Sequence, residues 1–361
     1  MNKLKVLQIT DSLNVGGTEV LAVNIANSLT EYCIASHFCC TREEGELKEK
    51  LDKKVGYLYL NKKSILDLKS LFKLKKYVVD NKINIIHAHS TSLFFSFCLK
   101  FLNPNIKLIW HNHTGANYYL KGLKFRVIKF LSRFSNAIIN VSKELDFWTK
   151  EKLKHKNSFK LNNFPLFITS EKITKLKGEH GKRIVFLAAL RSEKDHLTLL
   201  KSFREFYKFN TDWTLHLIGK DYLNTYSKQI RNFISEENLS NAIYMYDMCS
   251  DIQNILQQAT IGVLSSKSEG LPIALLEYGL AKLPVIVTNV GECNTVITDT
   301  ISGFLVKPNN TEKFASKLNI LANSKALRNA FGIEHYKNVT QNYSKELFIN
   351  NLLAIYTSTF D

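Results

Sequence analysis

Glu269 and Glu277 stand eight positions apart, with a glycine, a proline and an apolar run between them. A strand-like segment, residues 261–265, precedes them. Pro272 suits the first position of a helix, where its missing N–H would be unpaired anyway. Glu269 then lies in the loop at the helix mouth, and Glu277 lies one to two turns inside, roughly 7 to 8 Å along the axis at about 1.5 Å per residue. Free N–H groups and the positive dipole end favour an anion between them. Two hydroxyl-binding carboxylates beside an anion site are what a nucleotide-sugar pocket needs.

A pair of adjacent glycines, Gly16 and Gly17, follows the first predicted strand and opens a predicted helix. Adjacent glycines allow close approach of the backbone to a ligand, and the helix N-terminus favours phosphate. The segment lacks the G-x-G-x-x-G spacing of a dinucleotide-binding loop, so an NAD domain is not supported. Many strand-to-helix loops contain Gly-Gly, and the motif is weak by itself.

Two cations, Arg191 and Lys194, follow the first predicted strand of the second half of the chain. Two positive charges at the end of a strand can stabilise a leaving diphosphate without a metal. The alternative for Lys194 is a solvated cap of the next helix, and Asp195 and His196 are expected to cap that helix.

Four histidines stand at the ends of two predicted strands, where ligands of parallel sheets bind. They occur in the segments His87-Ala-His89 and His111-Asn-His113. Neither segment has the helical H-E-x-x-H pattern of a zinc protease. Strand-end packing is the simpler explanation for His87 and His89.

The residues around the glutamates resemble the C-terminal half of the family-4 (group 1) retaining glycosyltransferases, of the type that builds bacterial capsule, O-antigen or exopolysaccharide. The resemblance rests on residues 264–277, 284–288 and 303–306 and extends over nearly the whole chain. It implies that Glu269 contacts donor-sugar hydroxyls and is catalytic, and that Glu277 holds the nucleotide ribose. It also implies that Lys194 neutralises the diphosphate, that the Gly17 N–H binds phosphate beside a flexible Gly16, and that His113, or alternatively His111, faces the sugar. The predicted donor site is completed by Ser266, Gly270, Leu271, Pro272 and Ile273.

The chain departs from the family pattern at several positions near the nucleotide. Ala189 stands where the family commonly has arginine, and Arg191 is the candidate replacement. Ser265 replaces the usual proline, Thr295 stands where glutamate is frequent, and Asp247 stands in place of a loop glycine. These departures leave the identity of the donor open.

Strand-like and helix-like segments alternate along the chain in two series, which predicts an α/β protein with parallel sheets. We expect two doubly wound Rossmann-like domains facing a cleft, the GT-B fold of the resembled family. The predicted boundaries are an acceptor-side domain at 1–165, a linker at 166–182 and a nucleotide-sugar domain at 183–343. A C-terminal helix at 344–361 is expected to pack back on the first domain.

Composition is that of an ordinary globular protein, with 45% hydrophobic and 22% charged residues in 361. No apolar run reaches the ~20 residues of a membrane span, the N-terminus reads as a strand rather than a signal peptide, and six cysteines show no zinc spacing. A reduced cytoplasmic protein is therefore expected. No Asp-x-Asp stands in a suitable loop, so neither metal nor cofactor is expected to be required.

The positive charge is concentrated in the first half of the chain. Residues 1–165 carry 27 Lys and Arg against 13 Asp and Glu, a net of +14 out of the total of +17. Such a charge favours an anionic membrane or nucleic acid, and the absence of any nucleic-acid-binding motif disfavours the latter. Within residues 121–134, Arg126, Lys129 and Arg133 share one helical face with Phe125 beside it. This face is predicted to contact the inner surface of the cell membrane, with a solvated face as the alternative. The other side, containing Leu123, Val127, Phe130, Leu131 and Phe134, is expected to pack in the core.

The sequence therefore predicts a retaining hexosyltransferase that uses a nucleotide-diphosphate sugar, most simply UDP-linked, and a lipid-linked or membrane-associated glycan acceptor. Alternatives are a nucleotide-sugar epimerase or phosphorylase of the same layout, or a non-catalytic membrane-bound scaffold. The sugar, the linkage and the oligomeric state cannot be inferred from the sequence.

Overall fold

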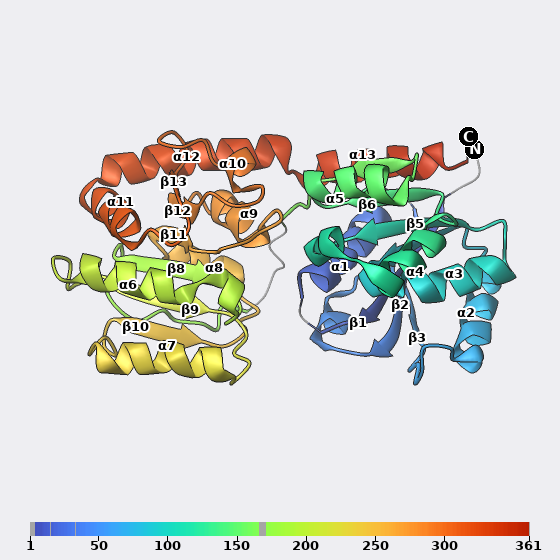
Figure 1. Ribbon diagram of the computed structural model, residues 1–361, viewed down its shortest axis with the longest axis horizontal. Helices are drawn as coiled ribbons and strands as arrows, with labels where there is room; N and C mark the ends of the chain where they lie inside the picture. Colours follow the sequence, from blue (N-terminus) through green and yellow to red (C-terminus); the bar gives the residue numbers. More distant parts are fainter. Residues whose placement is uncertain (1–3, 15, 33, 166–170, 361) are drawn as a thin grey trace. The chain divides into compact units, whose positions relative to one another are not determined.

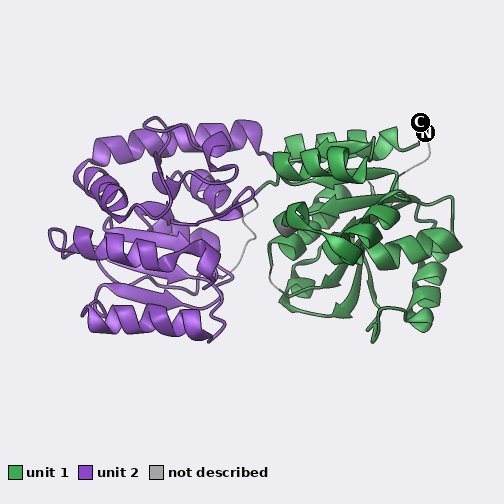
Figure 2. Ribbon diagram, viewed as in Figure 1, with its two compact units in different colours: residues 1–164, 345–361 green, residues 165–344 purple. Residues whose placement is uncertain are grey.

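A computed structural model describes residues 4–14, 16–32, 34–165 and 171–360. The chain divides into two compact units (Figure 2). The first unit comprises Met1–Phe164 and Lys345–Asp361, and the second comprises Pro165–Ser344. The first unit is therefore built from two separate stretches of the sequence, and its final helix belongs to the same unit as its first strand.

The first unit contains a seven-stranded parallel sheet in the order β3-β2-β1-β4-β5-β6-β7. Its strands are β1 (Lys5–Ser12), β2 (Ala35–Glu43), β3 (Gly56–Tyr59), β4 (Ile85–His89), β5 (Lys107–Asn112), β6 (Ala137–Asn140) and β7 (Ser158–Lys160). Its α-helices are α1 (Gly17–Glu31), α2 (Leu68–Asp80), α3 (Leu93–Leu102), α4 (Gly122–Ser132), α5 (Lys143–Trp148) and α13 (Lys345–Ser358). Figure 1 shows these elements with their labels.

The second unit contains a six-stranded parallel sheet in the order β10-β9-β8-β11-β12-β13. Its strands are β8 (Arg183–Leu187), β9 (Thr214–Ile218), β10 (Ile243–Tyr246), β11 (Ile261–Leu264), β12 (Val285–Thr288) and β13 (Phe304–Val306). Its α-helices are α6 (His196–Tyr207), α7 (Thr225–Glu236), α8 (Ile252–Gln258), α9 (Ile273–Leu280), α10 (Cys293–Val296), α11 (Thr311–Asn323) and α12 (Lys325–Asn342). The predicted fold class, two doubly wound Rossmann-like α/β domains, is confirmed.

The central strands are apolar runs because helices cover both faces of each sheet. Every residue of β4, β8 and β12 is buried. In both sheets the strand order reverses direction beside the first strand of the unit, between β1 and β4 and between β8 and β11. Parallel sheets bind ligands at the carboxyl ends of the strands at such a point. These two strand pairs therefore locate the candidate sites.

The segment predicted as a linker contains residues of the second unit's core. Residues 166–170 lie outside the described residues. Beyond them, Leu176 is buried, and the Ile173 and Thr174 backbone N–H groups donate to a carboxylate oxygen of Asp251 at 2.9 and 2.7 Å. The described part of this segment is thus hydrogen-bonded to the second unit despite its polar composition.

Among the described residues, none of the helices is both long and apolar enough to cross a membrane.

Candidate functional site

Lys194 and Glu269 form an ion pair at the carboxyl ends of β8 and β11. The Lys194 ammonium donates to both carboxylate oxygens of Glu269, at 2.7 and 2.8 Å. The Ser266 hydroxyl donates to Glu269 Oε1 at 2.6 Å. The Glu269 side chain is only 7% exposed, whereas that of Lys194 is 26% exposed. The structure thus brings three predicted site residues together at the point where the strand order of the second sheet reverses.

The two loops that carry this pair are joined by backbone and side-chain bonds. Ser265 Oγ donates to the carbonyl oxygens of Lys194 and Asp195 at 3.1 and 3.0 Å, and the Lys267 N–H donates to the Glu193 carbonyl at 2.8 Å. Ser265 stands where the resembled family has proline, and its hydroxyl supplies a link that proline could not. The Lys194 loop is therefore held in place by the loop that carries Glu269.

Glu277 lies on α9 and is half-buried. Desolvation raises the pKa of this carboxyl to about 7. Within the described part of the chain, its side chain has neither a hydrogen bond nor an ion pair, unlike Glu269. A half-buried carboxyl without a partner is costly unless a ligand satisfies it. Pairs of hydroxyls, such as those of a ribose, are suitable donors.

The mouth of α9 differs slightly from the prediction. Pro272 is the N-cap rather than the first helical residue, with φ −74° and ψ 117°, and the helix runs from Ile273 to Leu280. Gly270 is exposed, whereas Leu271 and Pro272 are buried. Gly291, at φ +54°, packs on this loop, and a Cβ there would clash with the Glu269 carbonyl oxygen. Only glycine combines this backbone conformation with so close an approach.

Arg191, the predicted second cation, is held away from Glu269 by a tyrosine. Its guanidinium donates to the Tyr222 hydroxyl from Nε at 3.2 Å and from Nη2 at 2.6 Å, and it lies over the Tyr222 ring. The Arg191 side chain is exposed. Of the two predicted cations, Lys194 therefore contacts the Glu269 carboxylate and Arg191 does not.

The glycine loop of the first unit leads into α1. Gly16 is the N-cap and Gly17 is the first residue of the 15-residue helix, while residue 15 is outside the described part. No neighbouring atom lies within 4 Å of the position where a Cβ of Gly17 would stand. A side chain at Gly17 would therefore meet no neighbour, whereas one at Gly16 would meet the Glu19 carboxylate. The phosphate-binding role of this loop stays a prediction.

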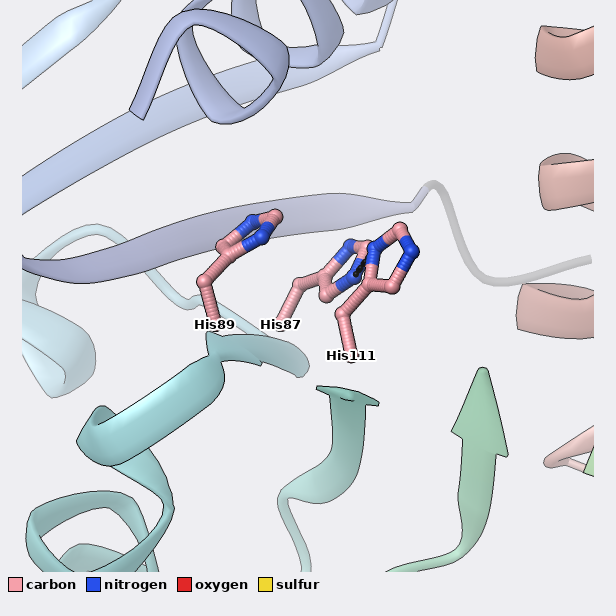
Figure 3. Close-up of side chains that lie close together, drawn as sticks. All are labelled: His87, His89 and His111. Carbon is pink, nitrogen blue, oxygen red and sulfur yellow. Dashed lines mark hydrogen bonds between the residues drawn. The ribbon is translucent and has the colours of Figure 1, made fainter. Parts of the chain in front are cut away.

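All four predicted histidines gather in one stacked cluster at the ends of β4 and β5. Ring centroids lie 4.5 Å apart for His87 and His89, and 4.0 Å apart for His111 and His113. The strand register explains the grouping, because His89 pairs with His111. Figure 3 shows three of the rings, with the hydrogen bond between His87 and His111. His113 is half-buried and the other three are fully buried.

Burial keeps the cluster neutral. Desolvation lowers the pKa of His87 and His113 to about 3, and it lowers the pKa of His89 and His111 well below the usual value. Nitrogens of His87, His89 and His111 lie within 4.8 Å of one another, close enough to share a metal ion after small ring rotations. Several of these nitrogens already bond to one another or to neighbouring side chains, so a metal would have to displace those bonds.

Two residues outside the predicted site complete the histidine cluster. Gln8 on β1 accepts from His89 Nε2 at 2.8 Å, and Tyr356 on α13 contacts His87 Nδ1 at 2.7 Å. Gln8 faces His87 in the strand register. Its polar side chain between the buried Leu7 and Ile9 was the available signal. No sequence pattern connects Tyr356 with His87, 269 positions away.

A second polar group at the end of β1 also escaped prediction. Asp11 accepts hydrogen bonds from Thr41 and Thr91, both at 2.6 Å. The buried Lys62 ammonium lies 3.8 Å from Asp11 Oδ1, and desolvation lowers its pKa. Asp11 follows directly on the buried run of β1, residues 6–10, which is the signal that could have identified it.

The α4 helix presents a different face to solvent from the one expected. Leu123, Val127, Phe130 and Phe134 are 77%, 44%, 53% and 39% exposed, so their predicted core position is wrong. Phe125, predicted at the membrane, is half-buried and packs edge-on against Trp148, with the half-buried Lys129 over its ring. Arg126 and Arg133 are exposed as predicted. The exposed surface of α4 is therefore an apolar stripe bordered by basic residues.

Comparisons with known proteins identify the family of the chain. Residues 168–338 match the family model "Glycosyl transferases group 1", and residues 15–156 match "Glycosyltransferase Family 4". An uncharacterized glycosyltransferase of Haemophilus influenzae is 24% identical, over 87% of this chain and 89% of its own. The UDP-Gal:alpha-D-GlcNAc-diphosphoundecaprenol alpha-1,3-galactosyltransferase of Escherichia coli is 25% identical, over 79% and 80%.

A solved structure shows the same fold over almost the whole chain. Anabaena HepE in complex with UDP and glucose superposes with a TM-score of 0.84 at 17% identity, covering 98% of this chain and all of that one. The two family models together cover the second sheet and most of the first, with the predicted site residues of both units. The chain therefore belongs to the group 1 glycosyltransferases of the GT-B fold.

Proposed function

We propose that this glycosyltransferase moves a hexose or N-acetylhexosamine, with retention of configuration, from a UDP-sugar to a lipid-linked glycan acceptor in surface-polysaccharide biosynthesis. The main support for this proposal is the contact of Lys194 and Ser266 with Glu269 at the ends of β8 and β11. The carboxyl of Glu277, which has no partner among the described residues, lies on the following helix.

Each part of a UDP-sugar has a chemically suitable partner in this group. Glu277 would accept hydrogen bonds from the ribose hydroxyls, and Lys194 would neutralise the diphosphate together with the N-terminus of α9. Glu269 would bind hydroxyls of the sugar. The E. coli relative is named for UDP-Gal, and the HepE structure holds UDP and glucose, which supports UDP as the donor nucleotide.

The reaction needs no metal in this scheme. The bond between the anomeric carbon and the diphosphate oxygen breaks, and the diphosphate leaves with the electron pair. The acceptor hydroxyl attacks the same face of the sugar, and its proton passes to the departing phosphate oxygen. Preorganised positive groups stabilise the charge that develops on the diphosphate, which is the role we assign to Lys194.

A membrane acceptor is supported by the exposed stripe on α4. The apolar side chains of Leu123, Val127 and Phe130 are bordered by the exposed basic residues Lys121, Lys124, Arg126 and Arg133. Apolar side chains beside basic ones complement an anionic lipid surface, at ~1 kcal/mol per basic residue. The E. coli relative is named for a diphosphoundecaprenol-linked acceptor. We therefore place the enzyme on the cytoplasmic face of the membrane.

A thermal-shift screen of nucleotides and nucleotide sugars tests the proposal, since a bound ligand stabilises the folded state by RT ln(1 + [L]/Kd). Stabilisation by UDP and by one or a few UDP-sugars is expected. A nucleotide sugar converted to its epimer without acceptor would identify an epimerase instead. A chain stabilised by no nucleotide would be a scaffold.

A further inference from the structure

The histidine cluster forms one continuous hydrogen-bonded chain whose ends are two different ring nitrogens. One branch runs from His113 Nε2 to His89 Nδ1 at 2.9 Å and from His89 Nε2 to Gln8 Oε1 at 2.8 Å. The other runs from Gln8 Nε2 to the Tyr356 hydroxyl at 3.3 Å, then to His87 Nδ1 at 2.7 Å. It ends at His111 Nδ1, 3.1 Å from His87 Nε2.

The Gln8 amide determines which nitrogens donate and which accept in the first branch. An amide oxygen only accepts hydrogen bonds, and a neutral imidazole carries one donor and one acceptor. His89 must therefore donate from Nε2 to Gln8 Oε1, which leaves His89 Nδ1 as an acceptor. His113 must then donate from Nε2, and its Nδ1 carries the lone pair.

The Tyr356 hydroxyl gives the second branch the same direction. It accepts from the Gln8 amide nitrogen, which can only donate. Among the described residues, His87 Nδ1 is the acceptor that its own buried proton can reach, so the hydroxyl donates there. The short 2.7 Å distance fits a phenol donating to an imidazole nitrogen. His87 then donates from Nε2 to His111 Nδ1, and the His111 proton stands on Nε2. That nitrogen has no hydrogen-bond partner among the described residues.

We propose that Gln8 and Tyr356 are positioning residues that hold all four histidines in the Nε2–H tautomer, so that His113 presents its Nδ1 lone pair to a hydroxyl of the sugar substrate. His113 is suited to this role because it is the half-buried ring of the cluster. The part concerning the substrate rests on the proposed transferase function, whereas the tautomers do not depend on it. Figure 3 shows that His87, His89 and His111 lie side by side across the ends of β4 and β5.

Nuclear magnetic resonance of the full-length chain with ¹⁵N-labelled histidine tests the tautomers directly, because long-range ¹H–¹⁵N correlations distinguish the protonated ring nitrogen. Signals are assigned with single histidine-to-asparagine variants. We expect His87, His89, His111 and His113 to carry the proton on Nε2. A proton on Nδ1 in His87, His89 or His113, or the spectrum of an imidazolium in any of them, would overturn the proposal.

Two variants separate the branches. Gln8→Leu removes both the acceptor of His89 and the donor to Tyr356, and should release all four rings from a single tautomer. Tyr356→Phe removes the donor to His87 and should release His87 and His111, while His89 and His113 keep theirs. Tyr77→Phe is the matched control, because Tyr77 bonds to His37 in the same unit, 2.9 Å from its Nδ1 and outside the cluster. Changes in His89 and His113 with Tyr356→Phe would show general loosening and contradict the scheme.

Once a nucleotide-sugar donor is known, turnover tests whether the orientation of His113 contributes to sugar transfer. Gln8→Leu should lower kcat about five- to tenfold, the effect of one misdirected hydrogen bond, with little change in KM for the nucleotide sugar. Tyr356→Phe should lower kcat less. Wild-type kcat in Gln8→Leu despite released tautomers would show that the orientation of His113 plays no part in transfer. If the wild type consumed no nucleotide sugar, the proposed function would fail while the tautomer result would stand.

Discussion

The Lys194 ammonium reaches both carboxylate oxygens of Glu269, at 2.7 and 2.8 Å, across 75 positions of sequence. We assign the two residues to different parts of one ligand, the diphosphate and the sugar. Without that ligand they neutralise each other, and the Ser266 hydroxyl adds a third contact to the pair. Diphosphate binding must therefore compete with Glu269 for Lys194, and this competition separates the effects of the two substitutions below.

Replacing Glu269 with Gln keeps the size of the side chain and removes its charge. Turnover should fall by roughly two to three orders of magnitude, as for loss of a group that acts on the transition state. UDP affinity should stay the same or rise, because Lys194 is freed from its partner. Steady-state kinetics and calorimetric titration with UDP measure the two effects. Glu193→Gln, on an exposed neighbour, is the control. Lost UDP affinity with retained turnover would reverse the assignment.

Replacing Lys194 with Ala removes the cation that contacts the diphosphate. A charge-assisted hydrogen bond is worth ~1.5–3 kcal/mol, so UDP should bind about ten- to a hundredfold more weakly, whereas uridine should bind as before. Lys267→Ala provides a matched control, because Lys267 pairs with Asp195 at 3.3 Å rather than with Glu269. Equal losses for uridine and UDP would show that Lys194 acts on the fold rather than on the phosphates.

Glu277 should make nucleoside binding depend on pH. Its pKa of about 7 leaves the carboxyl protonated in mildly acidic solution, and the carboxylate is the better acceptor for two ribose hydroxyls. Uridine affinity should therefore rise as the pH rises through 7. The free energy of unfolding has the opposite trend. Burial disfavours the charged form, so this contribution is fully present below the ordinary carboxyl pKa and is lost as the pH rises to about 7.

Glu277→Gln is the control for both trends, since an amide does not titrate. Its uridine affinity should be low and flat between pH 5 and 9, and its unfolding curve should lack the wild-type loss over that range. Parallel pH profiles for the two proteins would mean that another group titrates.

Changing Leu123, Val127 and Phe130 together to Ser should weaken binding to anionic vesicles. Each exposed apolar side chain that enters the lipid contributes about 1.5–3 kcal/mol. Changing Arg126 and Arg133 to Ser should have a smaller effect that disappears in 1 M salt, where the screening length is ~3 Å. Phe209→Ser, an 84% exposed aromatic of the second unit, is the control. If the triple variant co-sedimented with the vesicles as well as the wild type does, the proposed membrane contact of α4 would be wrong.

The local elements of the fold were predictable, because apolar runs and breaks in periodicity mark most of the helices and strands. The strands β3, β7 and β10 were missed, since each is short and only partly buried. Periodicity also gave the two faces of α4 but could not say which is buried. Phe125 packs against Trp148, 23 positions away, and only tertiary structure decides that contact.

The site was predictable where residues lie close in sequence to a strand end or a helix mouth. Lys194 and Glu269 could each be named, but their contact depends on β8 and β11 being neighbours, which the order of segments does not state. Gln8 and Tyr356 were missed for the same reason. They contact each other because α13, near the end of the chain, belongs to the same unit as β1.

The stereochemistry of slow donor hydrolysis tests the central claim most directly, because it requires no knowledge of the acceptor. The enzyme is incubated with each of a panel of α-linked nucleotide sugars, and the freed sugar is followed by ¹H magnetic resonance before its anomers equilibrate. We predict consumption of one or a few UDP-sugars, release of UDP, and the α-anomer as the first sugar seen. Loss of this activity in Glu269→Gln ties it to the site. A β-anomer as the first product would contradict the retaining mechanism, and consumption of other nucleotide sugars alone would contradict the UDP assignment.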